Sequence, residues 1–282
     1  MSGQFFTTKD GASLFYTTEG FESAPLILLL HGWSCDQNDW VLQYPFLLSL
    51  GFRVVGLDLR GHGRSTVSSS ITAFDPITQA EDTAGLLKHL GTNSQSQALV
   101  LGHSFGGLLA NELALRHPDL IRGIGIFDGG WNMTKPILDD FGPKLDAAAA
   151  PDITAVGRTG YALMEAIPGI YAPNTPAWVL PWHRRRVWGT DSRVLLETFR
   201  QMRTHLGESG AKYLEAKKTK GIPRFVTCSH QGSYSLQTEE VGVEEGFETV
   251  KLLPGGHWNM IAESERFNEL LKGWLEKWHF IP

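Results

Sequence analysis

The sequence predicts an α/β fold, a mainly parallel sheet flanked by helices, on three observations. Short apolar segments, such as residues 26–30 and 98–101, alternate with segments of helical periodicity. Several apolar segments end in polar or glycine-rich loops. Strands that are buried on both faces and joined by helices are typical of a parallel sheet with right-handed crossovers. The alternation stops over residues 131–220, which contain no convincing buried strand, so a mostly helical insertion is expected there.

Each expected element follows from a local pattern of apolar, turn and capping residues. The Lys9-Asp10-Gly11 triplet predicts a turn between two short strands within residues 4–18. Asp36 is a plausible N-cap for a helix reaching residue 50, and Gly91 is a stop signal for a helix over residues 76–90. The other expected strands are residues 26–30, 53–57, 98–101, 123–127, 223–228 and 248–252, with further helices at residues 108–116 and 263–278.

The 282 residues are suited to one large domain that carries an insertion. We expect residues 1–130 to form the first part of the core domain and residues 131–220 to form a helical cap. Residues 221–282 are expected to complete the core.

Composition excludes several classes of function. The formal net charge is −5 and no long basic run occurs, so nucleic acid is not an expected partner. The basic cluster at residues 183–186 is interpreted as a solvated helix face. The longest apolar run, residues 25–30, is far too short to span a bilayer, so no membrane association is expected. The two cysteines, Cys35 and Cys228, suggest neither a disulfide framework nor a metal site.

The amino-terminal sequence lacks the pattern of a signal peptide, and a cytoplasmic location is the expectation. A small-molecule substrate is the expected partner, and the chain could also form a homodimer. No cofactor and no metal are expected.

The sequence GHSFGG at residues 102–107 joins a buried strand directly to a helix. A strand, a G-x-S-x-G turn and a helix in this order are typical of a nucleophile elbow. Gly102 and Gly106 allow close backbone approach, which places Ser104 at the tip of the turn and at the amino end of a helix. Free N–H groups at that end favour a developing anion. Ser104 is therefore the candidate nucleophile.

A serine hydroxyl needs a base that titrates near neutral pH, and histidine fits this role. His257 lies in a glycine-rich loop after the last expected strand, so the order Ser…acid…His is preserved. The segment CSHQGSY at residues 228–234 carries no carboxylate at the usual place for the acid, whereas the preceding strand ends in Asp128. We assign the acid to Asp128, which would orient the imidazole. Asp152 and Glu239 are weaker candidates.

An oxyanion needs two hydrogen-bond donors, and the backbone amides of Trp33 and Phe105 are the candidates. His31 is expected to organise the loop that carries Trp33. The aromatic content of the insertion predicts a mid-sized, partly flat and apolar substrate. The candidate substrate-binding residues are Trp33, His103, Trp131, Trp178, Trp182 and Trp258.

Two other features have structural interpretations. The sequence DLRGHGRS at residues 58–65 is interpreted as a tight loop in which Asp58 and Arg60 hydrogen-bond locally, rather than as a phosphate site. Cys35 lies near the expected oxyanion loop but has no paired base, so it is interpreted as a packing residue.

With HGW at residues 31–33, DLRGHGRS at 58–65, GHSFGG at 102–107 and Gly256-His257, the chain resembles the α/β-hydrolase superfamily over essentially its whole length. The resemblance implies the α/β-hydrolase fold and a serine nucleophile, but it does not specify the substrate. Haloalkane dehalogenases and epoxide hydrolases use an aspartate nucleophile, so Ser104 argues against both. Zearalenone-type lactonases use serine and place their acid after the strand that here ends in Asp128.

The chain also resembles the cofactor-independent 2,4-dioxygenases of 3-hydroxy-4-quinolones, which place their acid after the same strand and use a His–Asp pair as base. It departs from them at Phe105 and Cys35, where those enzymes have histidines. A serine hydrolase cleaving an ester or lactone is therefore the first hypothesis. Oxygenolytic cleavage of a heteroaromatic ring, with His257 and Asp128 as base, is the alternative. A non-catalytic binding module is the third class, and the presence of serine, histidine and acid together argues against it.

Overall fold

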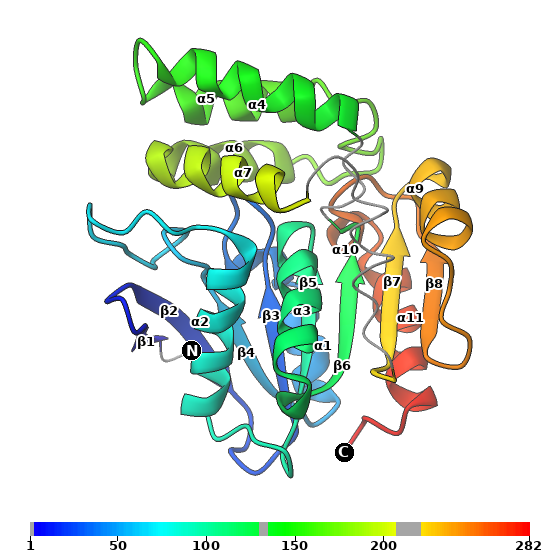
Figure 1. The fold of residues 1–282 in the computed structure, drawn as a ribbon. Helices are drawn as coiled ribbons and strands as arrows, with labels where there is room; N and C mark the ends of the chain where they lie inside the picture. The colour runs from blue at the N-terminus through cyan, green and yellow to red at the C-terminus, as the bar shows by residue number, and fades with distance from the viewer. Residues whose placement is uncertain (1–2, 130–134, 207–220) are drawn as a thin grey trace.

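Eight strands form a single sheet in a computed structural model that describes residues 3–129, 135–206 and 221–282 (Figure 1). The strand order across the sheet is β1-β2-β4-β3-β5-β6-β7-β8. The strands are β1 (Gly3–Thr7), β2 (Ser13–Glu19), β3 (Leu26–Leu30), β4 (Arg53–Leu57), β5 (Ala98–His103), β6 (Ile121–Phe127), β7 (Arg224–Cys228) and β8 (Glu248–Leu252). The first pairings, β1 with β2 and β2 with β4, are antiparallel and the remaining ones are parallel, which confirms the predicted α/β fold.

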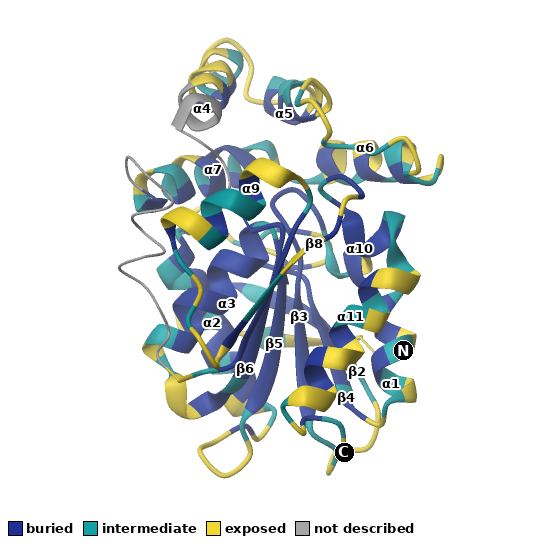
Figure 2. Cartoon of the chain, turned by 90° about the vertical axis from the view of Figure 1, so that its right-hand side faces the viewer, coloured by how far each residue is buried: buried dark blue, intermediate teal, exposed yellow. Residues whose placement is uncertain are grey.

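Helices cover both faces of the sheet, which agrees with the mostly apolar sequences of the central strands β3, β5 and β6. Helices α2 (Pro76–His89) and α3 (Phe105–Arg116) lie on one face, and α1 (Gln43–Ser49) and α11 (Ser264–Lys277) lie on the other (Figure 2). The short elements η1 (Gln37–Trp40), η2 (Pro118–Leu120), α9 (Gln231–Ser235), η4 (Leu236–Glu240) and α10 (Asn259–Ala262) complete the core. Because β3 to β8 pair in parallel, their carboxyl ends meet at one edge of the sheet.

Four helices form a layer above that edge (Figure 1). They are α4 (Lys135–Ala149), α5 (Ala155–Glu165), α6 (Val179–Gly189) and α7 (Ser192–Leu206). The indole of Trp33, which follows β3, packs edge-on against Phe141 of α4 and Phe199 of α7, with ring centroids 5.8 and 5.6 Å apart. Aromatic packing thus joins the helical layer to the core. The domain boundaries expected at residues 130/131 and 220/221 remain a prediction.

Local sequence explains where the helices begin. Asp75 caps α2 by accepting a hydrogen bond from the Thr78 amide at 3.0 Å, and Pro76 occupies the first turn. Asp36 caps η1 rather than a long helix, because the expected helix over residues 36–50 is divided into η1 and α1. Pro45 accounts for this division, since its ring lacks an N–H and is tolerated in the first turn of α1 but not inside a continuous helix.

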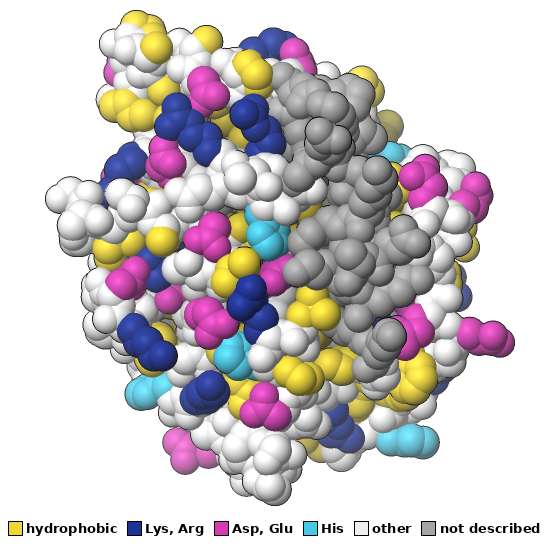
Figure 3. Space-filling view, viewed as in Figure 1, with side chains coloured by type: hydrophobic (Ala, Val, Ile, Leu, Met, Phe, Trp, Pro, Cys, Tyr) yellow, Lys and Arg dark blue, Asp and Glu magenta, His cyan; other side chains and the backbone are white. Residues whose placement is uncertain are grey.

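Two further observations concern the charges on the surface and the absence of membrane-spanning helices and metal-binding clusters among the described residues. Lys and Arg side chains are interspersed with Asp and Glu side chains on the face shown in Figure 3. Within the described part of the chain, no helix is long and apolar enough to cross a membrane, and no group of three or more His, Cys, Asp or Glu side chains is placed to hold a metal ion.

Candidate active site

The turn between β5 and α3 holds Ser104 in a strained backbone conformation, with φ 52° and ψ −115°. The turn is tight because two glycines allow backbone to pass against backbone. A Cβ on Gly102 would lie 2.1 Å from the carbonyl oxygen of Gly106, and a Cβ on Gly106 would lie 2.4 Å from that of Leu30. The helix α3 begins immediately after Ser104, so the serine lies at the amino end of the helix, and the Gly107 amide donates to the Ser104 carbonyl at 3.0 Å.

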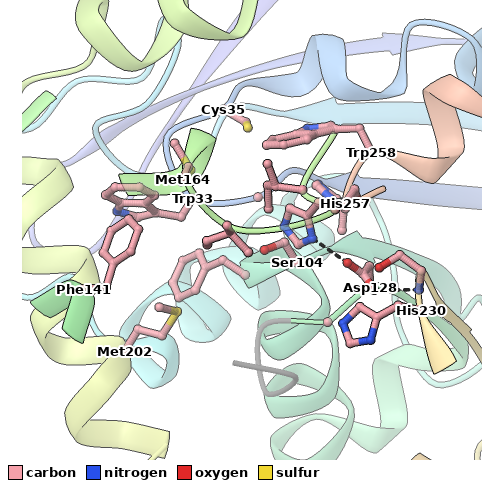
Figure 4. Close-up of a pocket in the computed structure, with 18 of the residues that line it drawn as sticks. Trp33, Cys35, Ser104, Asp128, Phe141, Met164, Met202, His230, His257 and Trp258 are labelled. Atoms are coloured by element: carbon pink, nitrogen blue, oxygen red, sulfur yellow. Dashed lines mark hydrogen bonds and ion pairs between the residues drawn. The ribbon is translucent and has the colours of Figure 1, made fainter. Parts of the chain in front are cut away.

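The candidate acid and the candidate base meet through a short hydrogen bond. Asp128 follows β6, the neighbour of β5, and the paired ends His103 and Phe127 bring it to the level of Ser104. Nδ1 of His257 lies 2.6 Å from Oδ2 of Asp128, and Figure 4 shows the Ser104 hydroxyl beside the same imidazole. Burial would raise the pKa of Asp128, but the hydrogen bond and charge of His257 and the Ser229 amide lower it below its usual value. Asp128 is therefore an ionised partner for the imidazole.

The end of β7 supports Asp128 instead of supplying its own carboxylate. The Ser229 amide donates to Oδ1 of Asp128 at 2.9 Å, and the Asp128 amide donates to the Thr227 carbonyl at 2.9 Å. Asp128 itself has a positive φ of 44°, which turns its carboxyl toward the His257 loop. The weaker candidates Asp152 and Glu239 are both exposed and do not line the pocket.

The loop that carries His257 is held at both its amide and its carbonyl group. The His257 amide donates to the carbonyl of Ile170, in the segment between α5 and α6, at 2.8 Å. The His257 carbonyl lies 2.8 Å from Nε2 of His103. Gly256 has φ 72°, and a Cβ there would lie 2.7 Å from both the Ala172 amide nitrogen and the Ile170 carbonyl oxygen. The segment around Ile170 thus determines how closely the loop can approach the core.

We expect Gly256→Ala to lower kcat about 100-fold, because the methyl group forces the loop away from Ile170 and moves the His257 ring by roughly 1 Å. The free energy of unfolding should fall by about 3 kcal/mol from the clash and the positive φ. Gly246→Ala is the matched control, since Gly246 has φ 83° with nothing within 4 Å of its Cβ position. Kinetics and thermal melting of both variants test this; similar behaviour of the two would show that the approach to Ile170 is unimportant.

The loop after β3 passes directly against Ser104. A Cβ on Gly32 would lie 3.1 Å from Cβ of Ser104. His31 organises this loop as expected, because Nδ1 contacts the Gly32 carbonyl at 2.7 Å and Nε2 accepts from the Leu59 amide at 2.9 Å. Within residues 3–129, 135–206 and 221–282, the amides of Trp33 and Phe105 donate no hydrogen bond to a protein group. The two amides that were predicted to bind an oxyanion therefore have no competing acceptor among these residues.

A pocket of about 130 Å³ opens beside Ser104, between the sheet edge and the helical layer. Figure 4 shows Trp33, Phe141, Met164 and Met202 around one side of it and His257 on the other. Its lining is mostly apolar: Gly32, Trp33, Cys35, His103, Ser104, Phe105, Asp128, Gly129, Phe141, Met164, Ile167, Pro168, Gly169, Ile170, Phe199, Met202, Ser229, His230, His257 and Trp258.

Of the six predicted substrate-binding residues, three line the pocket, two do not, and one lies outside the described residues. Trp33 and Trp258 line the pocket, as does the fully buried ring of His103, which contacts the His257 carbonyl. Trp178 and Trp182 do not line it: they pack edge-on against each other on α6, and Trp178 is 46% exposed. The reason is that α6 turns Val179, His183 and Val187 inward. Trp131 lies outside the described residues.

Several lining residues of the helical layer were not predicted. Phe141, Met164, Phe199 and Met202 supply most of the apolar wall on that side. The spacing of Leu195, Phe199 and Met202 in α7 was the available signal, since it places them on one face of a helix. Periodicity alone does not tell whether such a face meets the core or a ligand.

The residues interpreted as structural have structural contacts. Arg60 binds Asp10 and Asp82 at 2.6 and 2.8 Å, while Asp58 accepts hydrogen bonds from the backbone amides of Gln37 and Arg64. Cys35 is buried at the pocket wall, and burial raises the pKa of its thiol well above the usual value, which agrees with its interpretation as a packing residue.

The basic cluster at residues 183–186 is only partly the solvated face that was expected. Arg184 and Arg185 are exposed, but His183 is fully buried and the Arg186 side chain is only 8% exposed. The expectation was wrong for His183 and Arg186 because α6 packs this face onto the core, where Asp36 and Asp39 pair with Arg186.

Comparison with known proteins agrees with the fold. Residues 27–270 match the profile of the family described as "Alpha/beta hydrolase family", and the chain belongs to this family. A bifunctional esterase/perhydrolase of Acinetobacter calcoaceticus is 40% identical over 115 residues, which are 41% of this chain and 40% of that protein. A bifunctional epoxide hydrolase 2 of Sus scrofa is 32% identical over 124 residues, 44% of this chain and 21% of that protein. These alignments span less than half of either relative.

Solved structures match over nearly the whole chain, at lower identity. An enol-lactonase from Burkholderia xenovorans LB400 superposes with a TM-score of 0.76 at 20% identity, covering 97% of this chain and 100% of that one. A hydrolase from Pseudomonas aeruginosa PA01 superposes with a TM-score of 0.74 at 23% identity, covering 97% and 98%. At these identities the likeness demonstrates the shared fold.

Proposed function

We propose that the protein is a serine hydrolase that cleaves a carboxylic ester or lactone. One observation carries the proposal: a strained serine at the amino end of a helix lines an apolar pocket together with a histidine that is hydrogen-bonded to a buried, ionised aspartate. Ser104 is the nucleophile, His257 the general base and Asp128 the acid that orients His257. The backbone amides of Trp33 and Phe105 are the oxyanion donors.

The reaction follows the order of an acyl transfer. His257 takes the Ser104 proton as the oxygen attacks the carbonyl carbon, and the amides stabilise the charge of the tetrahedral intermediate. His257 then protonates the leaving alkoxide as the intermediate collapses to an acyl-serine. Water, deprotonated by the same imidazole, releases the acid and restores Ser104. Asp128 keeps the proton of the resting imidazole on Nδ1, so that the other ring nitrogen can act as base.

The pocket limits the substrate by size and polarity. Its volume of about 130 Å³ is close to the ~150 Å³ of apolar cavities that bind benzene. Trp33 and Phe141 give it flat apolar walls. We therefore propose that the group next to the reacting carbonyl is a single ring or a short branched chain, and that long acyl chains are poor substrates.

Features of related proteins support this proposal. A relative with 40% local identity is named an esterase/perhydrolase, and a structural neighbour is an enol-lactonase. Ser104 argues against epoxide-hydrolase activity despite the similarity to an epoxide hydrolase, because those enzymes are expected to carry an aspartate at this position.

A substrate screen that also measures oxygen uptake tests the function. Aryl esters with acetyl, benzoyl and decanoyl groups, monocyclic lactones and 3-hydroxy-4-quinolones should each be supplied to the wild-type protein. Hydrolysis of acetyl, benzoyl or lactone substrates without oxygen uptake is the expected result. Oxygen consumption with release of carbon monoxide from the quinolones would instead identify the cofactor-free dioxygenase.

A further inference from the structure

Arg186 reaches from the helical layer into the core, where it pairs with a fully buried carboxylate. Its Nη1 lies 2.7 Å from Oδ1 of Asp39, which belongs to η1, and 3.3 Å from Oδ1 of Asp36, which caps η1. The guanidinium also lies 3.6 Å above the ring of Trp182. Burial would raise the pKa of Asp39, but Arg186 and His103 hold it far below its usual value, so Asp39 is ionised.

The other oxygen of Asp39 faces the active site. Oδ2 lies 3.3 Å from Nδ1 of His103 and 3.5 Å from the amide of Gly32. The opposite nitrogen of His103 lies 2.8 Å from the carbonyl of His257. A continuous series of polar contacts therefore leads from α6 through Asp39 and His103 to the backbone of the proposed base. A branch at Gly32 reaches the loop of the proposed oxyanion donor.

Arg186 matters because it holds the Asp39 carboxylate that contacts the ring of His103. Both ring nitrogens face oxygen acceptors, while a neutral imidazole has only one N–H. Burial lowers the pKa of His103, which favours the neutral ring. Arg186 balances the buried charge of Asp39 and contacts its Oδ1, which leaves Oδ2 against Nδ1 of His103. Without Arg186, the buried Asp39 carboxylate would lose both its cation and the contact that fixes its position beside His103.

We propose that Arg186 is a positioning residue that, through Asp39 and His103, fixes the backbone of His257 and the amide of Gly32. On this view α6 helps to complete the reactive geometry of the core, in addition to covering the pocket. The inference rests on the proposed role of His257 as general base.

The test compares Arg186→Met with Arg185→Met. Both remove one charge from adjacent positions of α6, but Arg185 is exposed and forms no ion pair within the described residues. We expect Arg186→Met to lower kcat about 100-fold with little change in KM, as for a displaced catalytic group. The rate of phosphonylation by a fluorophosphonate, followed by intact mass, should fall by a similar factor. Arg185→Met should match the wild type in both measurements.

A second variant, Arg186→Lys, is the control for misfolding. Arg186→Met leaves a buried carboxylate without its cation, which can prevent folding, whereas Arg186→Lys keeps the charge but not the guanidinium geometry. If only the lysine variant folds, a kcat about tenfold below wild type at an unchanged melting temperature supports positioning. An unchanged kcat would restrict Arg186 to a folding role and overturn the inference.

The outcomes also separate the two proposals. A folded wild type that gains no phosphonyl adduct would contradict the serine-hydrolase proposal. A labelled wild type with equal labelling rates and equal kcat in folded Arg186→Met would contradict only the positioning role.

Discussion

Replacing Ser104 by alanine is expected to lower kcat about 10⁶-fold, the loss typical when the nucleophile of a serine hydrolase is removed. The methyl group cannot form the acyl-enzyme, and the remaining oxyanion donors and binding contacts give only weak catalysis of direct hydrolysis. Alanine keeps the Cβ at the strained turn, so the fold should be preserved. Initial rates with the best aryl ester or lactone, together with circular dichroism, measure this effect.

Ser70→Ala is the matched control, because Ser70 lies exposed in a loop and does not line the pocket. It should retain wild-type turnover. Substantial turnover in folded Ser104→Ala would contradict covalent catalysis and would fit a serine that only positions the substrate, as the dioxygenase alternative requires.

Asp128→Asn is expected to lower kcat about 10⁴-fold with a small effect on KM. The asparagine amide would place an N–H toward His257, which favours the wrong tautomer of the imidazole and cannot stabilise the imidazolium. The bond from the Ser229 amide can persist through the side-chain oxygen, so the local structure should survive. Steady-state kinetics near neutral pH, normalised to folded protein, measure this effect.

The controls are the two carboxylates that sequence analysis ranked lower. Asp152→Asn and Glu239→Gln remove exposed charges outside the pocket and should leave kcat unchanged. A large loss in either variant, with Asp128→Asn still active, would show that the acid has been assigned to the wrong strand.

The core of the fold could be predicted because its signals are local. The apolar runs Leu26–Leu30 and Ala98–His103 are buried on both faces, and parallel pairing then brings their carboxyl ends together. The same reasoning predicted that Ser104 and Asp128 lie at one edge of the sheet. The order of elements along the chain was sufficient to place His257 in the same region.

The helical layer could not be predicted to the same depth. Trp178 and Trp182 were expected to contact substrate because they are aromatic, yet α6 turns them away from the pocket. Arg186 was expected to be solvated because it lies in a basic run, yet it pairs with a carboxylate 147 positions earlier in the chain. The orientation of a helix depends on the partner it packs against, which periodicity does not specify.

The most direct test of an activated Ser104 is intact-mass analysis after incubation with a fluorophosphonate probe. The wild-type protein should gain the mass of one phosphonyl adduct, and Ser104→Ala should gain none under the same conditions. No adduct on folded wild-type protein, or the same adduct on Ser104→Ala, would contradict the proposed chemistry.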